Sequence, residues 1–240
     1  MGKPDIIYED NDIIVCYKPA GIATQTRRIG QQDMESFIRN YRAAKNEPPY
    51  VGIVHRLDQP VEGVMVFAKN QKAAASLSRQ IKEHTTEKYY RAASRGQGVS
   101  GTAVEDEEAW HTLTDYISFD KRTNTSKITS EKDRLAKKAV LQYRVISVTP
   151  DRDSSQNECI RTEFDIKLLT GRHHQIRLQL ANIGYPLIGD TKYGKPASNN
   201  SGTGSKSGRT GGGAREQLAL CSYKIVFDHP ATGDRMTFEL

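Results

Sequence analysis

The stretch "VHRLDQPVEGVMVFAKN" (54–70) carries the clearest structural signal in this sequence of 240 residues. Its second half contains the apolar run 64–67, which predicts a buried strand. Its first half places His55, Arg56 and Asp58 directly before a turn rich in Pro, Glu and Gly. A strand that leaves such a turn can hold a carboxylate rigidly at the edge of a cleft. Taken alone, Asp58 fits a nucleophile, a general base, a metal ligand, or a turn former that hydrogen-bonds its own backbone.

The composition is that of an ordinary folded protein with a basic surface. Hydrophobic residues make up 36% of the chain, and the formal net charge is +6. A chain of this length can bury a substantial core, and a basic surface favours polyanionic partners, above all nucleic acid. No apolar stretch reaches the length of a membrane span, and the N-terminus lacks the apolar core of a signal peptide. We therefore expect a cytoplasmic protein without a membrane partner.

Periodicity predicts both helices and strands, in no regular βαβ order. Apolar residues recur at helical spacing in 31–46, 70–82 and 171–184, and they alternate at strand spacing in 12–18, 87–94, 139–148, 159–169 and a C-terminal hairpin within 223–240. The polar region 97–137 is expected to form an outer hairpin with long loops. The Gly/Ser-rich segment 195–217 predicts a mobile loop rather than a domain linker. This mixture indicates an α+β fold with mainly antiparallel strands.

A second polar cluster lies in "TGRHHQIRLQLANIG" (170–184), where a strand gives way to a helix. Its members are Arg172, His173, His174, Gln175 and Arg177. Free backbone N–H groups at a helix start favour anions, so a phosphate or carboxylate partner would suit the cluster, although a solvated basic helix start remains open. The two histidines do not predict a metal site, because neighbouring helical residues point about 100° apart. The three widely spaced cysteines also predict neither a disulfide framework nor a zinc site.

Two adjacent tyrosines, Tyr89 and Tyr90, lie in the extended segment "EKYYRA" (87–92). Successive side chains of a strand face opposite ways, so one tyrosine should be buried and the other exposed. A tyrosine in this position can stack on a nucleobase or can simply pack against the core, and the residue type fits both roles.

Six short motifs follow one another along nearly the whole chain. They are "KPAG" (18–21), "HRLD" (55–58) with Gly63 and "AK" (68–69) after it, "EKYY" (87–90), "TGRHHQIRLQLA" (170–181), "PLIGDTKYG" (186–194) and "FDHPATG" (227–233). In this order and spacing they resemble the RluA family of RNA pseudouridine synthases. The resemblance implies a single catalytic domain over 1–240 with the α+β pseudouridine synthase fold: a mixed, mostly antiparallel central sheet, flanking helices and a central catalytic cleft.

The activity that the resemblance implies is isomerisation of specific uridines in structured RNA to pseudouridine, with no cofactor and no metal. Ribosomal RNA is the favoured substrate and tRNA the alternative, and we expect a monomer. Because the sequence reaches the first motif almost at once, we expect a catalytic domain without the N-terminal S4-type RNA-binding domain that relatives commonly carry. The alternative hypothesis is a catalytically inactive RNA-binding protein on the same scaffold.

The resemblance also implies roles for individual residues. Asp58 would be the essential carboxylate, which either attacks the nucleoside or removes a ribose proton, and Arg177 would form an ion pair with it. Tyr90 would stack on the target uracil and assist removal of the C5 proton. The target base must leave the RNA stack to react, and Arg56 would occupy the gap that it leaves. Arg172 and Gln175 would contact the RNA backbone, together with basic helix faces around Arg39 and Lys82.

Departures from the family pattern fall beside these motifs. Val61 and Glu62 replace the usual Thr-Ser pair after "HRLD", which places a negative charge near Asp58. Cys221 and Ser222 stand where relatives commonly have His-Ala. These changes leave Asp58 and the other two expected catalytic residues intact, but they make substrate choice and turnover open questions.

Overall fold

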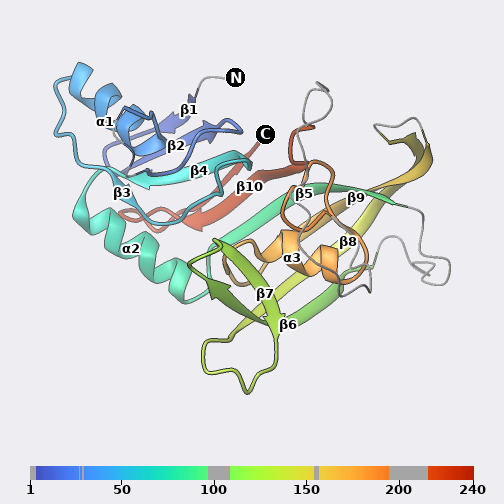
Figure 1. The fold of residues 1–240 in the computed structure, drawn as a ribbon. Coiled ribbons are helices and arrows are strands. Elements are labelled where there is room, and N and C mark those ends of the chain that lie inside the picture. Colours follow the sequence, from blue (N-terminus) through green and yellow to red (C-terminus); the bar gives the residue numbers. More distant parts are fainter. Residues whose placement is uncertain (1–3, 27, 29, 97–108, 154–156, 195–215) are drawn as a thin grey trace.

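The computed structural model describes residues 4–26, 28, 30–96, 109–153, 157–194 and 216–240 (Figure 1). The strands are β1 (Asp5–Glu9), β2 (Ile13–Lys18), β3 (Gly52–Ile53), β4 (Glu62–Ala68), β5 (Glu87–Gly96), β6 (His111–Asp120), β7 (Thr125–Thr129), β8 (Lys137–Arg152), β9 (Glu158–Leu168), β10 (Leu220–Asp228) and β11 (Arg235–Glu239). The helices are α1 (Met34–Ala44), α2 (Gln71–Lys82) and α3 (Gln175–Asn182).

The strands of the described residues form one mixed sheet. Its order is β1-β2-β4-β10-β5-β9-β8-β6-β7, with β11 added to β10 and β3 added to β4. Among these named strands the pairing of β4 with β10 is parallel and every other pairing is antiparallel. The predicted α+β class with a mostly antiparallel sheet is therefore confirmed.

Helices pack on both faces of this sheet. One core cluster joins Ile14 and Cys16 of β2 to Met34 and Ile38 of α1 and to Ile176 and Leu180 of α3. A second cluster joins Ile13 and Val15 of β2 to Ala73 and Leu77 of α2, and a small third one contains Leu178 of α3. As a result β2 and β4 are buried on both faces, whereas the sequence reading gave β2 only one apolar side.

The helices begin where local hydrogen-bond chemistry places them. Asp33 and Ser36 form a capping box at the start of α1, and the side chain of Asn70 accepts from the backbone N–H of Ala73 at the start of α2, as its sequence predicted. The third helix differs from expectation. Instead of one apolar side, α3 has all of its residues from 175 to 180 buried. Its polar side chains must therefore find partners inside the protein.

Other expectations have mixed outcomes. The outer hairpin is present as β6 and β7, and the C-terminal hairpin as β10 and β11. Strand β1 was not predicted. The segment 97–108 and most of the expected mobile loop, 195–215, lie outside the described residues. In the part of the chain that is described, no helix combines the length and apolar character needed to cross a bilayer.

A partly buried ionic network ties β1 to α1 and to the end of β4. The carboxylate of Glu9 lies 2.6 Å from Lys69 Nζ and 2.8 Å from Lys45 Nζ, and it accepts a hydrogen bond from the Tyr41 hydroxyl at 2.7 Å. Burial acts to raise the pKa of Glu9, but these three donors outweigh burial and lower the pKa to about 2. The charged form of Glu9 therefore stabilises the fold.

Replacing this carboxylate tests the network. Glu9→Gln should lower the free energy of unfolding at pH 7 by about 1–3 kcal/mol, because the buried cation Lys69 loses a charged partner. The folded pKa of Glu9 lies below its ordinary value of 4.5, so its contribution is present above about pH 4.5 and is lost as the pH falls towards 2. Urea unfolding at pH 7 and pH 3 measures the difference. The exposed Glu158→Gln is the control, and a gap that stays equal at both pH values would contradict the prediction.

Candidate active site

The loop that carries Asp58 is fixed by hydrogen bonds to its backbone. It connects β3 to β4, and the N–H of Val61 donates to the carbonyl of Asp58 at 3.0 Å, which closes a turn. The hydroxyl of Thr24 accepts from the N–H of Leu57 at 3.1 Å and donates to its carbonyl at 2.9 Å. Thr24 therefore binds both backbone polar groups of the residue before Asp58. The Asp58 side chain itself stays 32% exposed.

Lys18 also binds the backbone of this loop. Its side chain is fully buried, and Nζ donates to the carbonyls of Pro19, Ile22 and Gln59 at 3.1, 2.6 and 3.2 Å. Burial lowers the pKa of Lys18 to about 8, and the charge of Asp58 acts in the opposite direction. The "KPAG" turn is thus joined to the residue that follows Asp58. Sequence reasoning missed this role of Lys18.

Two basic side chains of the 170–184 cluster approach Asp58. Arg177 Nη1 lies 3.7 Å from Asp58 Oδ2, and His174 Nε2 lies 3.5 Å from the same oxygen. Both basic side chains are about 5% exposed, so they meet the carboxylate from the protein interior. The sequence predicted a phosphate or carboxylate partner for this cluster, and in the structure Asp58 of the same chain is such a partner.

The closest partner of Arg177 is Asp190, which sequence reasoning missed. Arg177 Nε and Nη2 donate to the two carboxylate oxygens of Asp190 at 2.8 and 2.7 Å, the bidentate geometry that guanidinium groups favour. Asp190 Oδ1 also accepts the backbone N–H groups of Lys192 and Tyr193. Burial acts to raise the pKa of Asp190, but Arg177 outweighs it and holds that pKa below its usual range. Only Nη1 of Arg177 is left to face Asp58.

His174 is held by a tyrosine from the same segment as Asp190. Its Nδ1 lies 2.9 Å from the Tyr193 hydroxyl, and its backbone adopts the left-handed conformation with φ of 54°. Burial and the charge of Arg177 lower the pKa of His174 to about 3. The residue expected to be part of a cationic cluster is therefore a neutral imidazole at physiological pH.

Tyr90 and Tyr89 face opposite ways, as their spacing predicted. Tyr90 is 5% exposed and belongs to the core cluster under α1 and α3, whereas Tyr89 is half-buried and its hydroxyl donates to Glu87 at 2.5 Å. Burial raises the pKa of Tyr90; a hydrogen bond with Ser222 opposes the rise and the charge of Asp58 adds to it. The phenol of Tyr90 therefore stays protonated.

The expected RNA-binding residues have different surroundings. Arg56 is exposed at a 450 Å³ pocket that Gln25, Glu35 and Val51 also line. Arg172 is half-buried, with Nε donating to the carbonyl of Lys138 at 2.8 Å.

Gln175 is 3% exposed. Its side-chain oxygen accepts from Thr170 and from the backbone of Arg172, and its nitrogen donates to Gln179. This burial argues against contact with RNA and gives Gln175 a role in fixing the start of α3.

His55, the first residue of "HRLD", serves the backbone of the site. Its Nε2 accepts the backbone N–H of Val66 at 3.1 Å. Burial, with a smaller effect of the charge on Lys88, lowers the pKa of His55 to about 3. His55 is therefore neutral and holds the loop against β4.

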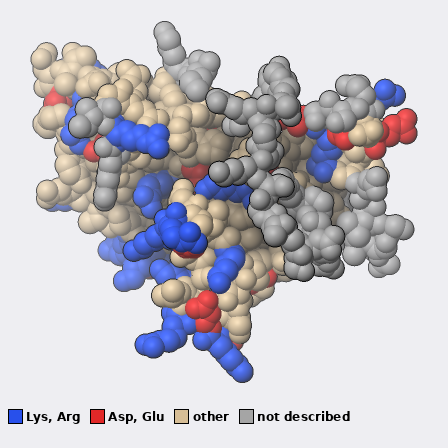
Figure 2. All heavy atoms as spheres, in the orientation of Figure 1, with Lys and Arg blue, Asp and Glu red and all other residues tan. Residues whose placement is uncertain are grey.

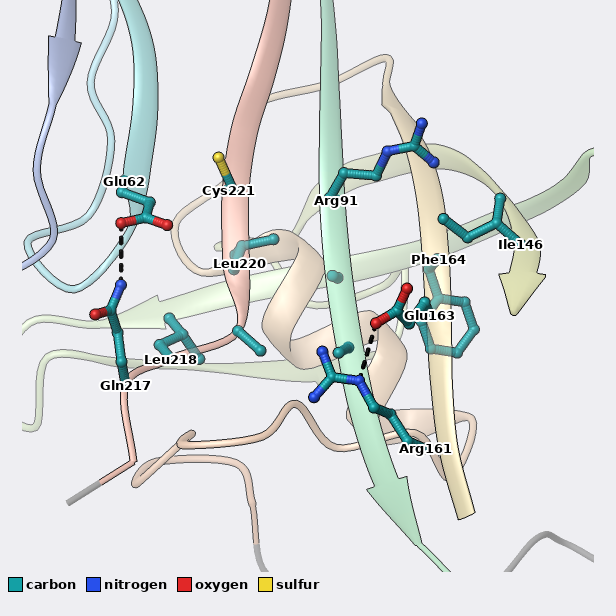
Figure 3. A pocket seen from close by; sticks show the side chains of 13 residues that line it. Glu62, Arg91, Ile146, Arg161, Glu163, Phe164, Gln217, Leu218, Leu220 and Cys221 are labelled. Carbon is teal, nitrogen blue, oxygen red and sulfur yellow. Dashed lines mark hydrogen bonds and ion pairs between the residues drawn. The ribbon is translucent and has the colours of Figure 1, made fainter. Parts of the chain in front are cut away.

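The two departures from the family pattern are neighbours in space. Glu62 and Cys221 are paired across the parallel contact of β4 with β10. Glu62 accepts from the hydroxyl of Tyr17 at 2.9 Å and from Gln217 at 3.0 Å, in a 390 Å³ pocket that Figure 3 shows. Asp58 does not line this pocket. Burial raises the pKa of Cys221 to about 11, with a smaller contribution from the charge of Glu62, so the thiol is unreactive as a nucleophile.

One group in the described residues brings metal-ligand atoms close together: Asp10, Asp12 and His229. Its polar atoms already have partners. His229 Nε2 lies 2.9 Å from Asp10 Oδ2, and its Nδ1 accepts the backbone N–H of Thr232 at 3.1 Å. This cluster joins the β1–β2 turn to the β10–β11 turn and belongs to different loops from Asp58, so it acts as a structural link.

Comparison with known proteins gives consistent matches. The model of the family described as RNA pseudouridylate synthase matches residues 12–182. The uncharacterized RNA pseudouridine synthase YhcT of Bacillus subtilis is 32% identical over 99% of this chain and 68% of its own length. The ribosomal large subunit pseudouridine synthase D of Neisseria meningitidis serogroup B is 30% identical over 98% of this chain, which spans only 57% of that relative.

A solved structure shares the fold. The human RNA pseudouridylate synthase domain containing 1 superposes with a TM-score of 0.68 at 22% identity, over 99% of this chain and 83% of that one. The pseudouridine synthase fold implied by the motifs is thereby confirmed. The chain belongs to the RNA pseudouridylate synthase family, a family of isomerases.

Proposed function

We propose that this protein converts specific uridines of ribosomal RNA to pseudouridine, acting as a monomer in the cytoplasm. The observation that carries the proposal is the carboxylate of Asp58, which is 32% exposed and lies beside Arg177 and the buried Tyr90. Ribosomal RNA is favoured over tRNA because several relatives are named ribosomal large subunit pseudouridine synthase D.

The proposed reaction rearranges bonds within one nucleotide. The bond from uracil N1 to ribose C1′ breaks, the base turns, and C5 bonds to C1′; C5 then loses its proton and N1 gains one. Asp58 would act either by attacking the nucleoside or by removing a ribose proton, and both routes need an ionised carboxylate. The guanidinium of Arg177 places a positive charge 3.7 Å from this carboxylate.

Tyr90 suits stacking on the flipped uracil better than acting as a base. Its pKa is raised by burial and by the charge of Asp58, so a phenolate would be costly at neutral pH. A protonated phenol still offers an aromatic face to a nucleobase. We therefore assign Tyr90 to stacking on the uracil and not to removal of the C5 proton.

The RNA would approach across a basic face. Figure 2 shows Lys and Arg side chains gathered over the lower part of the molecule, where Figure 1 places the end of α2 and the β6–β7 hairpin. The exposed basic residues of the hairpin and the segment after it are Lys121, Arg122, Lys127, Lys132, Arg134, Lys137 and Lys138. Such residues bind phosphates regardless of sequence, while exposed Arg56 would enter the gap left by the flipped base.

The role of Asp58 has a direct test. With RNA labelled with tritium at uracil C5, Asp58→Asn should slow tritium release by about 10⁴-fold or more while RNA binding persists. The control is Asp234→Asn, an exposed aspartate in the C-terminal turn. Tritium release at the wild-type rate by Asp58→Asn would contradict the assignment. Salt-sensitive RNA binding with no release from the wild type would favour the inactive RNA-binding alternative.

The bidentate contact of Asp190 with Arg177 can be tested by mutation. Asp190→Asn leaves the buried guanidinium without its bidentate partner, which should lower the free energy of unfolding by about 2–4 kcal/mol. The displaced Arg177 should also lower kcat for tritium release by about 10- to 100-fold, with KM little changed. Urea unfolding and steady-state kinetics measure both effects, with the neighbouring exposed Thr191→Ala as the control. An unchanged kcat in a folded Asp190→Asn protein would show that Asp190 does not position Arg177.

The hairpin prediction concerns binding alone. Lys121→Gln with Arg122→Gln should weaken RNA binding and reduce the slope of log K against log salt concentration by about 2, one for each lost phosphate contact. The rate at saturating RNA should stay the same. The control is Arg152→Gln, an exposed arginine at the end of β8. An equal loss of binding in the control would mean that the effect comes from net charge and not from the hairpin.

A further inference from the structure

His174 occupies a position between Asp58 and the β6–β7 hairpin that the proposed chemistry has not used. Its Nε2 faces Asp58 Oδ2 at 3.5 Å and its Nδ1 faces the Tyr193 hydroxyl at 2.9 Å. The side chain is 6% exposed, so water has little access to either nitrogen. The two nitrogens of a neutral imidazole differ, one being a donor and the other an acceptor, so the protein must select one tautomer.

Ser126, which donates to Tyr193, favours one tautomer of His174. The backbone N–H of Ser126, at the start of β7, lies 2.8 Å from the Tyr193 hydroxyl oxygen. A backbone N–H can only donate, so this oxygen accepts from Ser126 and its own hydrogen is free to point at His174 Nδ1. Nδ1 then accepts, and the proton of the neutral ring lies on Nε2. The Nε2–H group faces the carboxylate of Asp58.

The surroundings of His174 keep the ring neutral. The cations Arg177 and Lys192 and the adjacent ring of His173 disfavour a second proton, and Asp190 favours it. Burial is the largest effect, and the resulting pKa of about 3 leaves His174 uncharged from pH 5 to pH 8. A neutral donor can orient a carboxylate without placing another formal positive charge beside it.

Both neighbours of the carboxylate approach the same oxygen. His174 and Arg177 each face Asp58 Oδ2, and among the described residues no hydrogen bond or ion pair reaches Oδ1. We propose that His174 is a positioning residue that directs its Nε2–H at Asp58 Oδ2, 3.5 Å away, with its tautomer favoured by Tyr193 and Ser126, so that Oδ1 is the oxygen presented to the nucleotide. The kinetic part of this inference rests on the proposed isomerase activity, and the tautomer does not.

The tautomer can be measured directly. In protein labelled with ¹⁵N at histidine, nitrogen shifts between pH 5.5 and pH 8 distinguish the Nε2–H tautomer from the Nδ1–H tautomer, and the loss of one ring in His174→Asn assigns the signal. The wild type should show the Nε2–H form throughout, and Tyr193→Phe should weaken that preference without reversing it, because Asp58 alone then favours Nε2–H. A wild-type ring in the Nδ1–H form, or one that titrates near pH 6.5, would overturn the proposal.

Two amide substitutions separate positioning from structure. The amide nitrogen of Gln can reach the place of Nε2, whereas the amide of Asn reaches only the place of Nδ1. His174→Asn should therefore lower kcat by about 10- to 100-fold with KM within about twofold of wild type, and His174→Gln should recover most of the loss. Asn tolerates the left-handed backbone better than Gln, so a purely structural role predicts the opposite order.

The opposite order, or no loss in His174→Asn, would overturn the positioning role. If the wild type shows no isomerase activity, the proposed function fails while the NMR measurement still decides the tautomer.

Discussion

The buried guanidinium of Arg177 is the group on which the rest of the site depends. A cation that is 5% exposed needs a charged partner inside the protein, and the fully buried carboxylate of Asp190 supplies it with two short hydrogen bonds. That arrangement uses two of the three guanidinium nitrogens and fixes the plane of the group. The third nitrogen then points at Asp58, which remains 32% exposed. One carboxylate thus offsets the burial of the cation, and the other stays available for chemistry.

This division explains why three motifs that are far apart in the sequence meet here. The "HRLD" loop brings Asp58, the helix after "TGRHH" brings Arg177, and the "PLIGDTKYG" segment brings Asp190. The "KPAG" turn contributes no reacting group, but Lys18 and the N–H of Gly21 bind the carbonyl of Gln59 and so support the loop. Each motif therefore has a physical task, either at the carboxylate or in holding its backbone.

Much of the fold could be predicted because helices and strands leave local signals. The capping residue Asn70, the alternation in β8 and β9 and the C-terminal hairpin are read from a few neighbouring residues. Burial on both faces of β2 was missed, although the continuous run from Ile13 to Cys16 is typical of such a strand.

The site could be predicted less well, because partners are chosen over long distances. The nearness of Asp58 to Arg177 came from the family resemblance and not from spacing. Asp190, 13 residues from Arg177, carried no local signal of its role. Long-range packing also decides the charge of His55 and His174. Burial lowers the pKa of both side chains to about 3, so both are neutral hydrogen-bonding groups.

The departures from the family pattern also have partners that are distant in the sequence. In the sequence, Glu62 places a negative charge near Asp58, because only three residues separate them. In the sheet, Glu62 is paired with Cys221, the second departure, and its carboxylate is satisfied by Tyr17 and Gln217. The neighbouring Gly63 shows how closely the two strands approach: a Cβ there would lie 2.2 Å from the carbonyl oxygen of Ser222. The charge of Glu62 is therefore stabilised by its own neighbours, Tyr17 and Gln217. The carboxylate of Asp58 keeps its two separate partners, His174 and Arg177.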